Sequence, residues 1–284
     1  MKLSKTVPVH RDFVLLLAFV VLKFAIQYHL ISPEYDLHRD EYLHLDQANH
    51  LAWGYVSVPP LTSWISTVIA WLGNTVFWVK FFPALFGALT IVVVWKAVKV
   101  LGGGLYAQFV VLLCLLFSSL LRTNTLYQPN SLDVLCWTSM YYLIVRFWGT
   151  GRVRYLYISA VVLAIGFLNK YNILFLVAGL LPAVAVLPSR QVFARRELYL
   201  AALLFVILVS PNLWWQFVHG FPVISHMREL IDTQLVHTSV SSFLRSQLMY
   251  FIGGLPLLLG GVYALLSCRS FAVYRPLLSA FVFT

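Results

Sequence analysis

The chain has 284 residues, of which 61% are hydrophobic and only 11% are charged, and its mean hydropathy is +0.83. Soluble domains carry about 25% charged residues, so this composition excludes an ordinary soluble protein. The net charge of +10 does not indicate nucleic-acid binding, because no basic stripe on a soluble surface is present to carry it. The sequence predicts an all-α polytopic membrane protein.

Long apolar runs recur along the chain and predict about eight spans in a single transmembrane domain covering residues 1–284. Most are near the length that crosses a ~30 Å hydrocarbon core at about 1.5 Å per residue. In chain order they are Phe13–Leu30, Phe81–Val98, Leu105–Leu121, Ser131–Phe147, Tyr155–Leu168, Asn172–Leu187, Leu198–Trp214 and Met249–Leu266. The last run, Leu277–Thr284, is too short, so we expect a truncated ninth helix and a missing C-terminal part.

Two short features near the N-terminus need separate interpretation. Lys2, Lys5 and Arg11 precede the first run, which is too long for a signal peptide and lacks a cleavage site, so we expect an uncleaved first helix. The run Leu61–Leu72 follows Pro59-Pro60 and reaches only about 18 Å as a helix. It predicts an interfacial or re-entrant helix.

Charge placement supports this topology. With the N-terminus inside, most Lys and Arg residues fall on the inner side, as the positive-inside rule requires. All acids except Asp12 and Glu197 fall outside or at the outer ends of helices, and so do all histidines except His10. Basic residues inside are topology signals, whereas acids and histidines gathered outside predict a site at the outer membrane surface.

The segment "DLHRDEYLHLDQANH", Asp36 to His50, holds the densest group of ionisable residues. As a helix from Arg39 to Trp53 it is amphipathic, and Asp40 and His44 share its polar face, which we expect to point to water or a cavity. Glu41 lies about 100° around the axis from Asp40. The alternatives are a solvated polar loop and a metal site at Asp40 and His44.

Further candidates follow along the chain. Asp133 lies about one turn into an apolar helix, where a carboxylate is costly unless it is paired or faces a wet cavity; the structural alternative is a partner for Arg122 or a helix cap. Lys170 in "GFLNKYNILF" is either a snorkelling lysine or a cation for a lipid phosphate. His226 and Arg228 follow an aromatic belt in "PNLWWQFVHGFPVISHMREL". Three scattered cysteines indicate packing residues.

Several motifs in order carry a family resemblance: the acidic pair, "GYVSVPPLTSWI", "FFPALFGALTIVVVWKAVKVLGG", "QPNSLDVLCWTSMYYLIVRF" and "GFLNKYNILFL". Together they resemble family 39 of the membrane glycosyltransferases with the GT-C fold. That group includes the dolichyl-phosphate-mannose–protein mannosyltransferases and the lipid A aminoarabinose transferase. The resemblance covers about Asp36 to Leu230. It departs at Val58, where many relatives have a histidine, and in the shortness of this chain.

The resemblance implies an enzyme that moves a sugar from a polyprenyl-phosphate donor to a lipid, glycan or protein acceptor, with inversion, on the extracytoplasmic face of a bacterial inner membrane. Its catalytic acid corresponds to Asp40, with Glu41 beside it, and Asp133 corresponds to a second acid. Lys170 corresponds to a phosphate contact and His226 to a metal ligand, so a divalent cation is the cofactor it allows. We add four residues as substrate contacts: Arg122, Arg228, His44 and Tyr55.

The chemistry fits these residue types. A sugar phosphate already has a good leaving group, so the reaction needs a carboxylate base for the acceptor hydroxyl and positive charge for the departing phosphate. Two rivals remain: a transporter or lipid-sugar flippase, since intramembrane charges mark substrate paths, and a non-catalytic membrane scaffold. Transporters place charges near the midplane and often have two related halves, whereas here the charges lie at one surface.

Overall fold

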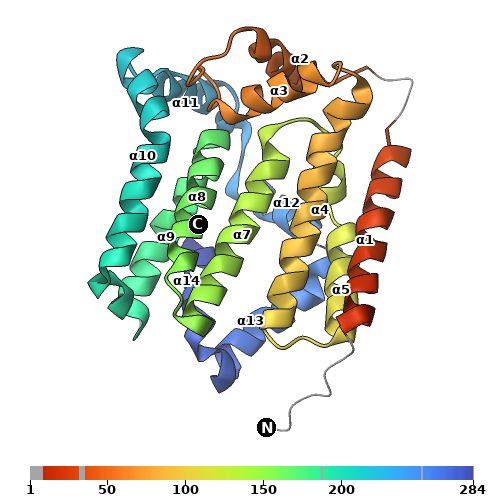
Figure 1. Ribbon diagram of the computed structural model, residues 1–284, viewed down its shortest axis with the longest axis vertical. Helices are drawn as coiled ribbons and strands as arrows, with labels where there is room; N and C mark the ends of the chain where they lie inside the picture. Colours follow the sequence, from red (N-terminus) through yellow and green to blue (C-terminus); the bar gives the residue numbers. More distant parts are fainter. Residues whose placement is uncertain (1–8, 32–35, 187, 251, 284) are drawn as a thin grey trace.

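The computed structural model describes residues 9–31, 36–186, 188–250 and 252–283, and these residues form helices joined by short turns, with no strand among them. In Figure 1 a row of helices runs side by side along the long axis of the molecule, and shorter helices lie across its two ends. The all-α fold predicted from composition is confirmed. Lys2, Lys5, Leu187 and Thr284, which the predictions used, lie outside the described residues.

The long elements are α1 (Val9–His29), α4 (Val76–Val100), α5 (Leu105–Leu116), α7 (Pro129–Thr150), α8 (Arg154–Asn169), α9 (Ile173–Val186) and α10 (Arg196–Val218). Each overlaps a predicted span. By length and composition three described helices can cross a membrane: Arg11–His29, α4 and α10. A bent pair near the C-terminus makes a fourth if it counts as one span, and α5, α8 and α9 are shorter apolar helices.

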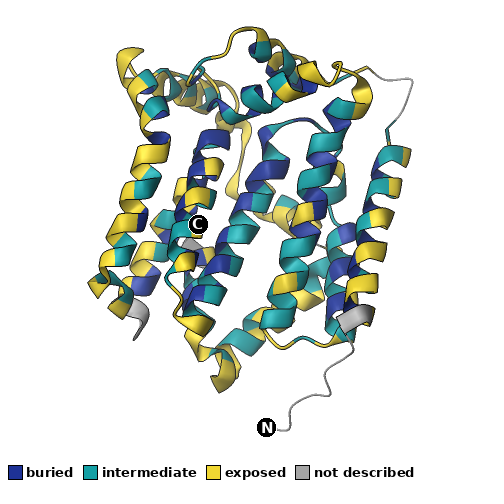
Figure 2. Cartoon of the chain, in the orientation of Figure 1, coloured by how far each residue is buried: buried dark blue, intermediate teal, exposed yellow. Residues whose placement is uncertain are grey.

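Exposed apolar side chains cover the outside of the bundle. Phe13, Leu17 and Val21 lie exposed along α1, and Leu203 and Ile207 lie exposed along α10. Figure 2 shows this pattern as exposed positions on the outward faces of the outermost helices. Such surfaces are unfavourable in water and favourable against lipid tails. The protein is an integral membrane protein.

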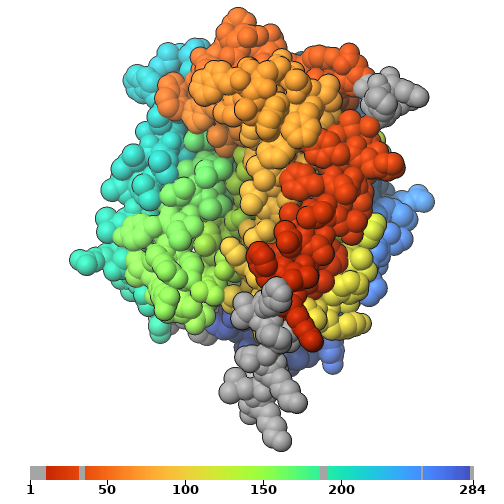
Figure 3. All heavy atoms as spheres, turned by 45° about the vertical axis from the view of Figure 1, so that its right-hand side comes forward, coloured from red at the N-terminus to blue at the C-terminus, as the bar shows by residue number. Residues whose placement is uncertain are grey.

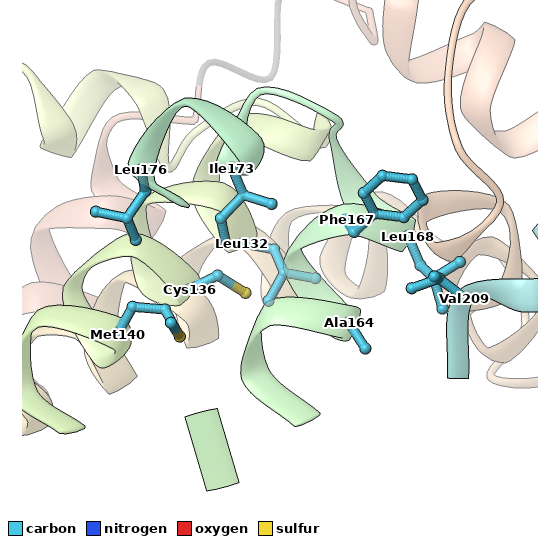
Figure 4. Packing of buried hydrophobic residues seen from close by; sticks show 9 residues of the cluster. All are labelled: Leu132, Cys136, Met140, Ala164, Phe167, Leu168, Ile173, Leu176 and Val209. Atoms are coloured by element: carbon cyan, nitrogen blue, oxygen red, sulfur yellow. The ribbon is translucent and has the colours of Figure 1, made fainter. Parts of the chain in front are cut away.

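The core lies where α7, α8, α9 and α10 meet. Its buried cluster combines residues of all four helices: Leu132, Cys136, Met140, Ala164, Phe167, Leu168, Ile173, Leu176 and Val209 (Figure 4). A glycine suits the close approach of α9 to α8, because a Cβ on Gly166 would clash with the Ile173 side chain unless that side chain shifted. Cys136 is a packing residue, as predicted.

One end of the bundle is covered by a polar layer, which we call the site end. It comprises α2 (Arg39–Asp46), the 3₁₀ turn η1 (Gln47–Asn49), α3 (Leu61–Trp71) and α11 (Pro222–Thr233), all of which lie across the helix ends in Figure 1. Figure 3, turned by 45°, shows the same layer over α1 and α4. The prediction that Leu61–Leu72 does not span is confirmed, since α3 lies in this layer.

Three predicted boundaries were wrong. The Arg39–Trp53 helix ends at Asp46 and continues only as η1. The Leu105–Leu121 span stops at Leu116, and a short α6 (Leu120–Thr123) follows the Ser118-Ser119 break. The Met249–Leu266 span is divided into α12 (Val240–Tyr250) and α13 (Leu255–Ser267), with Ile252–Ser267 turned by 63° from α12. Gly253-Gly254 has low helix propensity and Pro256 suits a helix start, which explains the break. The last run forms α14 (Arg275–Phe283).

Candidate functional site

The acidic pair opens α2 through a reciprocal cap. The His38 side chain accepts a hydrogen bond from the Asp40 backbone N–H at 3.2 Å, and the Glu41 carboxylate accepts one from the His38 N–H at 2.8 Å. Such a capping box satisfies N–H groups that the first helical turn leaves unpaired. It fixes the start of the helix, and the two neighbouring carboxylates therefore point in different directions.

Glu41 is completely buried and holds the site end together. Its two oxygens lie 2.6 and 2.7 Å from the ammonium of Lys80 in α4, and Oε1 also accepts from the Tyr127 backbone N–H at 2.7 Å. With the cap, this carboxylate accepts four hydrogen bonds. A carboxylate so engaged cannot easily take a proton from a substrate. Glu41 is a positioning residue that ties α2 to α4 and to the chain before α7.

Asp40 is the more accessible member, with 35% of its side chain exposed. Its Oδ2 accepts a hydrogen bond from the Gln128 amide at 2.8 Å, and its Oδ1 lies 3.2 Å from Nε of Arg39, whose side chain is 90% exposed. A surface ion pair of this kind contributes about 0–1 kcal/mol. One oxygen of Asp40 is therefore easily released toward a ligand.

A row of hydrogen bonds joins Asp40 to Lys170 across two helix ends. Gln128 Oε1 accepts from the Asn130 amide at 3.1 Å, and Asn130 Oδ1 accepts from the Lys170 ammonium at 2.9 Å. Gln128 and Asn130 flank Pro129, which begins α7 where a missing N–H costs little. Asn169, the last residue of α8, donates to the Pro129 carbonyl at 2.8 Å. These contacts set the end of α8, and hence Lys170, beside the start of α7.

Asp133 lies one turn further into α7, on the Lys170 side. Its Oδ2 accepts from the Asn172 amide at 2.8 Å, and the ammonium of Lys170 is near enough to attract the carboxylate without direct ion-pair contact. The other oxygen, Oδ1, has no well-formed hydrogen bond, although the indole N–H of Trp137 interacts with the carboxylate. A buried oxygen in this state can accept from a polar ligand.

The polar face of α2 points into the protein. Asp40 is half-buried, while His44 and Gln47 are buried and Tyr42 and Leu43 are exposed. The partners of this face are protein side chains: Gln47 accepts from Ser63 of α3 at 2.9 Å, and His44 lies 3.4 Å from Gln47. Polar side chains on α3 and near Tyr127 supply partners that solvent would otherwise provide.

His44 predicts a pH dependence of stability. Burial lowers the pKa of His44 from 6.5, against smaller opposing effects of Gln47 and Asp40. The unfolded chain therefore binds a proton more readily than the folded one, and stability falls as pH drops below about 6.5. We expect the thermal midpoint in detergent to fall more between pH 7.5 and 5.5 for the wild type than for His44→Gln. His50→Gln, at an exposed position on the same segment, should behave like the wild type; equal slopes for all three proteins would contradict this.

The remaining predicted contacts do not join this row. The Tyr55 hydroxyl closes its own loop, donating to the carbonyls of Gln47 and His50 at 3.2 and 3.0 Å. Arg228 is exposed on α11, without an ion pair among the described residues. His226 lies 3.8 Å from Glu229, and the described residues contain no group of three or more His, Cys, Asp or Glu side chains placed to hold a metal. The described side chains near His226 therefore do not fit a bound cation.

Arg122 lines a separate cavity of about 720 Å³ beside the start of α2. The same cavity is bordered by His38, Arg39 and Glu41, the immediate neighbours of Asp40, and by Lys80. Lys170 and Asp133 do not line it. The ion pair of Arg122 with Asp133, one alternative from the sequence, is not present among the described residues.

A sequence profile of the dolichyl-phosphate-mannose-protein mannosyltransferase family matches residues 57–215, more than half of the chain. The chain belongs to this family. The match covers α3 to most of α10 and includes Asp133 and Lys170, whereas α2 with Asp40 precedes it. No solved structure gives a significant match.

This mannosyltransferase-family protein is also similar to a curated relative, the lipid A galacturonosyltransferase RgtD of Rhizobium johnstonii. The two are 24% identical in an alignment 202 residues long, which covers 66% of this chain and 41% of the relative. The chain thus matches less than half of the relative's length. The resemblance inferred from the sequence motifs is confirmed at the level of the family.

Three residues of this family member were missed as site residues. Lys80 is one of the basic residues outside the inner set, and Gln128 and Asn130 stand in "QPNSLDVLCWTSMYYLIVRF" without a predicted role. A lysine one turn into an apolar helix is the same signal that drew attention to Asp133. The two amides gave no such signal, because Gln and Asn around a proline are typical of any helix start.

Proposed function

We propose that this protein is an inverting glycosyltransferase that moves a sugar from a polyprenyl-phosphate donor to an acceptor hydroxyl at the site end, on the extracytoplasmic face of the membrane. The observation that carries the proposal is the row Asp40–Gln128–Asn130–Lys170. It links an accessible carboxylate to a cation, the two charges that such a transfer requires.

Asp40 acts as the base. As the acceptor oxygen attacks the anomeric carbon, Asp40 takes its proton, the bond from that carbon to the phosphate oxygen breaks, and the electron pair leaves with the polyprenyl phosphate. Lys170 stabilises the negative charge of the leaving phosphate. Oδ1 of Asp133, which has no well-formed hydrogen bond, accepts from a sugar hydroxyl of the donor.

The acceptor occupies the cavity that Arg122 lines. The cavity is bordered by His38, Arg39 and Glu41, the residues on both sides of Asp40, although Asp40 itself does not line it. The acceptor hydroxyl must therefore extend beyond the cavity to meet the base. Donor and acceptor then approach α2 from different sides. An arginine in the cavity favours an acceptor with phosphate or carboxylate groups, since guanidinium binds both through paired hydrogen bonds.

The donor assignment is tested in proteoliposomes with a synthetic polyprenyl-phosphate sugar and a lipid A-type acceptor. We expect transfer by the wild type, and for Lys170→Gln a fall in kcat/KM of roughly a hundredfold, the size that loss of one electrostatic contact to a developing charge produces. Arg228→Gln, an exposed cation of the same layer, should retain activity. Movement of the donor across the bilayer without a new glycosidic bond would instead show a flippase.

A further inference from the structure

The end of the bundle opposite the site end carries two arginines that converge on one neutral oxygen. Arg146, in the last turns of α7, donates through Nε and Nη2 to the Tyr155 hydroxyl at 3.0 and 2.7 Å, and Arg154 donates to the same oxygen at 3.1 Å. The two guanidinium carbons lie 5.3 and 5.0 Å from the centre of the Tyr155 ring. The turn between α7 and α8 thus brings two like charges together.

A third arginine joins them at the same aromatic cluster. Arg195, just before α10, lies 5.7 Å from the centre of the Phe147 ring, and Phe147 packs with Tyr155 and Leu143. None of the three arginines forms an ion pair with a carboxylate among the described residues. Asp12 and Glu197, the acids in the first turns of α1 and α10, pair with Lys99 and Arg196 instead. Like charges held together without a counter-ion repel each other.

An apolar crevice adjoins this cluster. It has a volume of about 120 Å³ and lies between the same ends of α7, α8 and α9 and the turn before α10, with Phe147, Trp148, Leu156, Leu181 and Phe193 among its walls. Phe147 belongs both to the crevice and to the contact with Arg195. A hydrocarbon tail could therefore lie in the crevice while a charged group at its end meets the arginines.

We infer that the cluster binds an anionic phospholipid of the adjacent leaflet, with its phosphate between Arg146, Arg154 and Arg195 and one acyl chain in the crevice. Each guanidinium has five N–H donors, and the Tyr155 oxygen uses only a few of them, which leaves a fork of donors suited to a phosphate. Basic pockets between helices at a membrane surface are known to bind lipid head groups. The lipid neutralises the charges that the fold brings together.

Native mass spectrometry of the detergent-solubilised protein, titrated with phosphatidylglycerol or phosphatidylcholine, tests the inference. We expect the wild type to retain phosphatidylglycerol preferentially and the Arg146→Gln/Arg154→Gln variant to bind it roughly tenfold more weakly, since several charge-assisted hydrogen bonds are lost. Arg152→Gln is the matched control, because Arg152 is an exposed cation of the same turn whose side chain does not contact Tyr155.

Two further measurements keep the test decisive. The Arg146→Lys/Arg154→Lys variant preserves the inner positive charge that orients the helices but loses the guanidinium fork, so it should also bind more weakly; unchanged binding would mean that the arginines act only as topology signals. Inorganic phosphate should not protect the wild type against heating as phosphatidylglycerol does. Equal protection by inorganic phosphate, or no preference of the wild type between the two lipids, would overturn the inference.

Discussion

Asp40→Asn should reduce sugar transfer by about a hundredfold to ten-thousandfold, the usual contribution of a positioned general base. The amide cannot take the acceptor's proton, yet its oxygen can still accept the hydrogen bond from Gln128 that the carboxylate accepts at 2.8 Å. The fold and membrane insertion should therefore be unchanged. The measurement is the single-turnover rate at saturating donor, with the thermal midpoint recorded in the same preparation.

Asp46→Asn supplies the matched control. Asp46 is the last residue of α2, is exposed, and among the described residues its side chain accepts only from the Asn49 amide, at 3.4 Å. The Asp46→Asn substitution removes the same charge from the same helix and leaves the hydrogen bonds from Asp40 to Lys170 intact. This variant should therefore keep the wild-type rate. A fully active Asp40→Asn would reject Asp40 as the base, and a loss shared with Asp46→Asn would show that only the local charge matters.

Breaking the buried pair of Glu41 and Lys80 should have the largest effect on stability. The Glu41 side chain is fully buried and that of Lys80 is 11% exposed, so removing one partner leaves a charge without compensation in a poorly solvated place. Lys80→Met should destabilise the protein by about 3–5 kcal/mol. Glu41→Gln should cost a similar amount and would also weaken the bonds to Tyr127 and His38.

A double-mutant cycle separates the pair from its surroundings. The Glu41→Gln/Lys80→Met protein contains no unpaired buried charge, so it should be more stable than the sum of the two single losses indicates, by about 1–3 kcal/mol. Chemical or thermal unfolding in detergent, followed by tryptophan fluorescence, gives the four values. Strict additivity would show that the two side chains do not act as a unit.

The sequence predicted the fold more completely than the site. Apolar runs mark α1, α4, α7 and α10 because a membrane helix exposes its side chains to lipid, and the short run at Leu61 could not be mistaken for a span. The break inside Met249–Leu266 coincides with Gly253-Gly254, but a hydropathy average over the whole run does not register two glycines. The helix propensity of these residues, not their hydropathy, determines where the helix is interrupted.

Site residues were predictable where a charge was out of place and not elsewhere. The charges that stand out in this apolar chain are those of Asp40, Asp133 and Lys170. In the structure a row of hydrogen bonds connects Asp40 to Lys170, and Asp133 lies near that lysine. The sequence could not show that Asp40 is accessible while its neighbour Glu41 is buried and paired. This difference depends on Tyr127 and Lys80, which approach Glu41 only once α4 and the start of α7 are in position.

The partners of the α2 layer also fix the order in which the protein can be completed during synthesis. The Glu41 carboxylate can accept from the Tyr127 N–H only after residue 127 has been synthesised. The Trp53 carbonyl accepts its hydrogen bond from Asn212, which follows it by 159 residues. At about 5–20 residues per second a ribosome needs roughly 8–30 s to cover that interval. The segment around Trp53 therefore acquires this hydrogen bond only after the part of α10 that carries Asn212 has been synthesised.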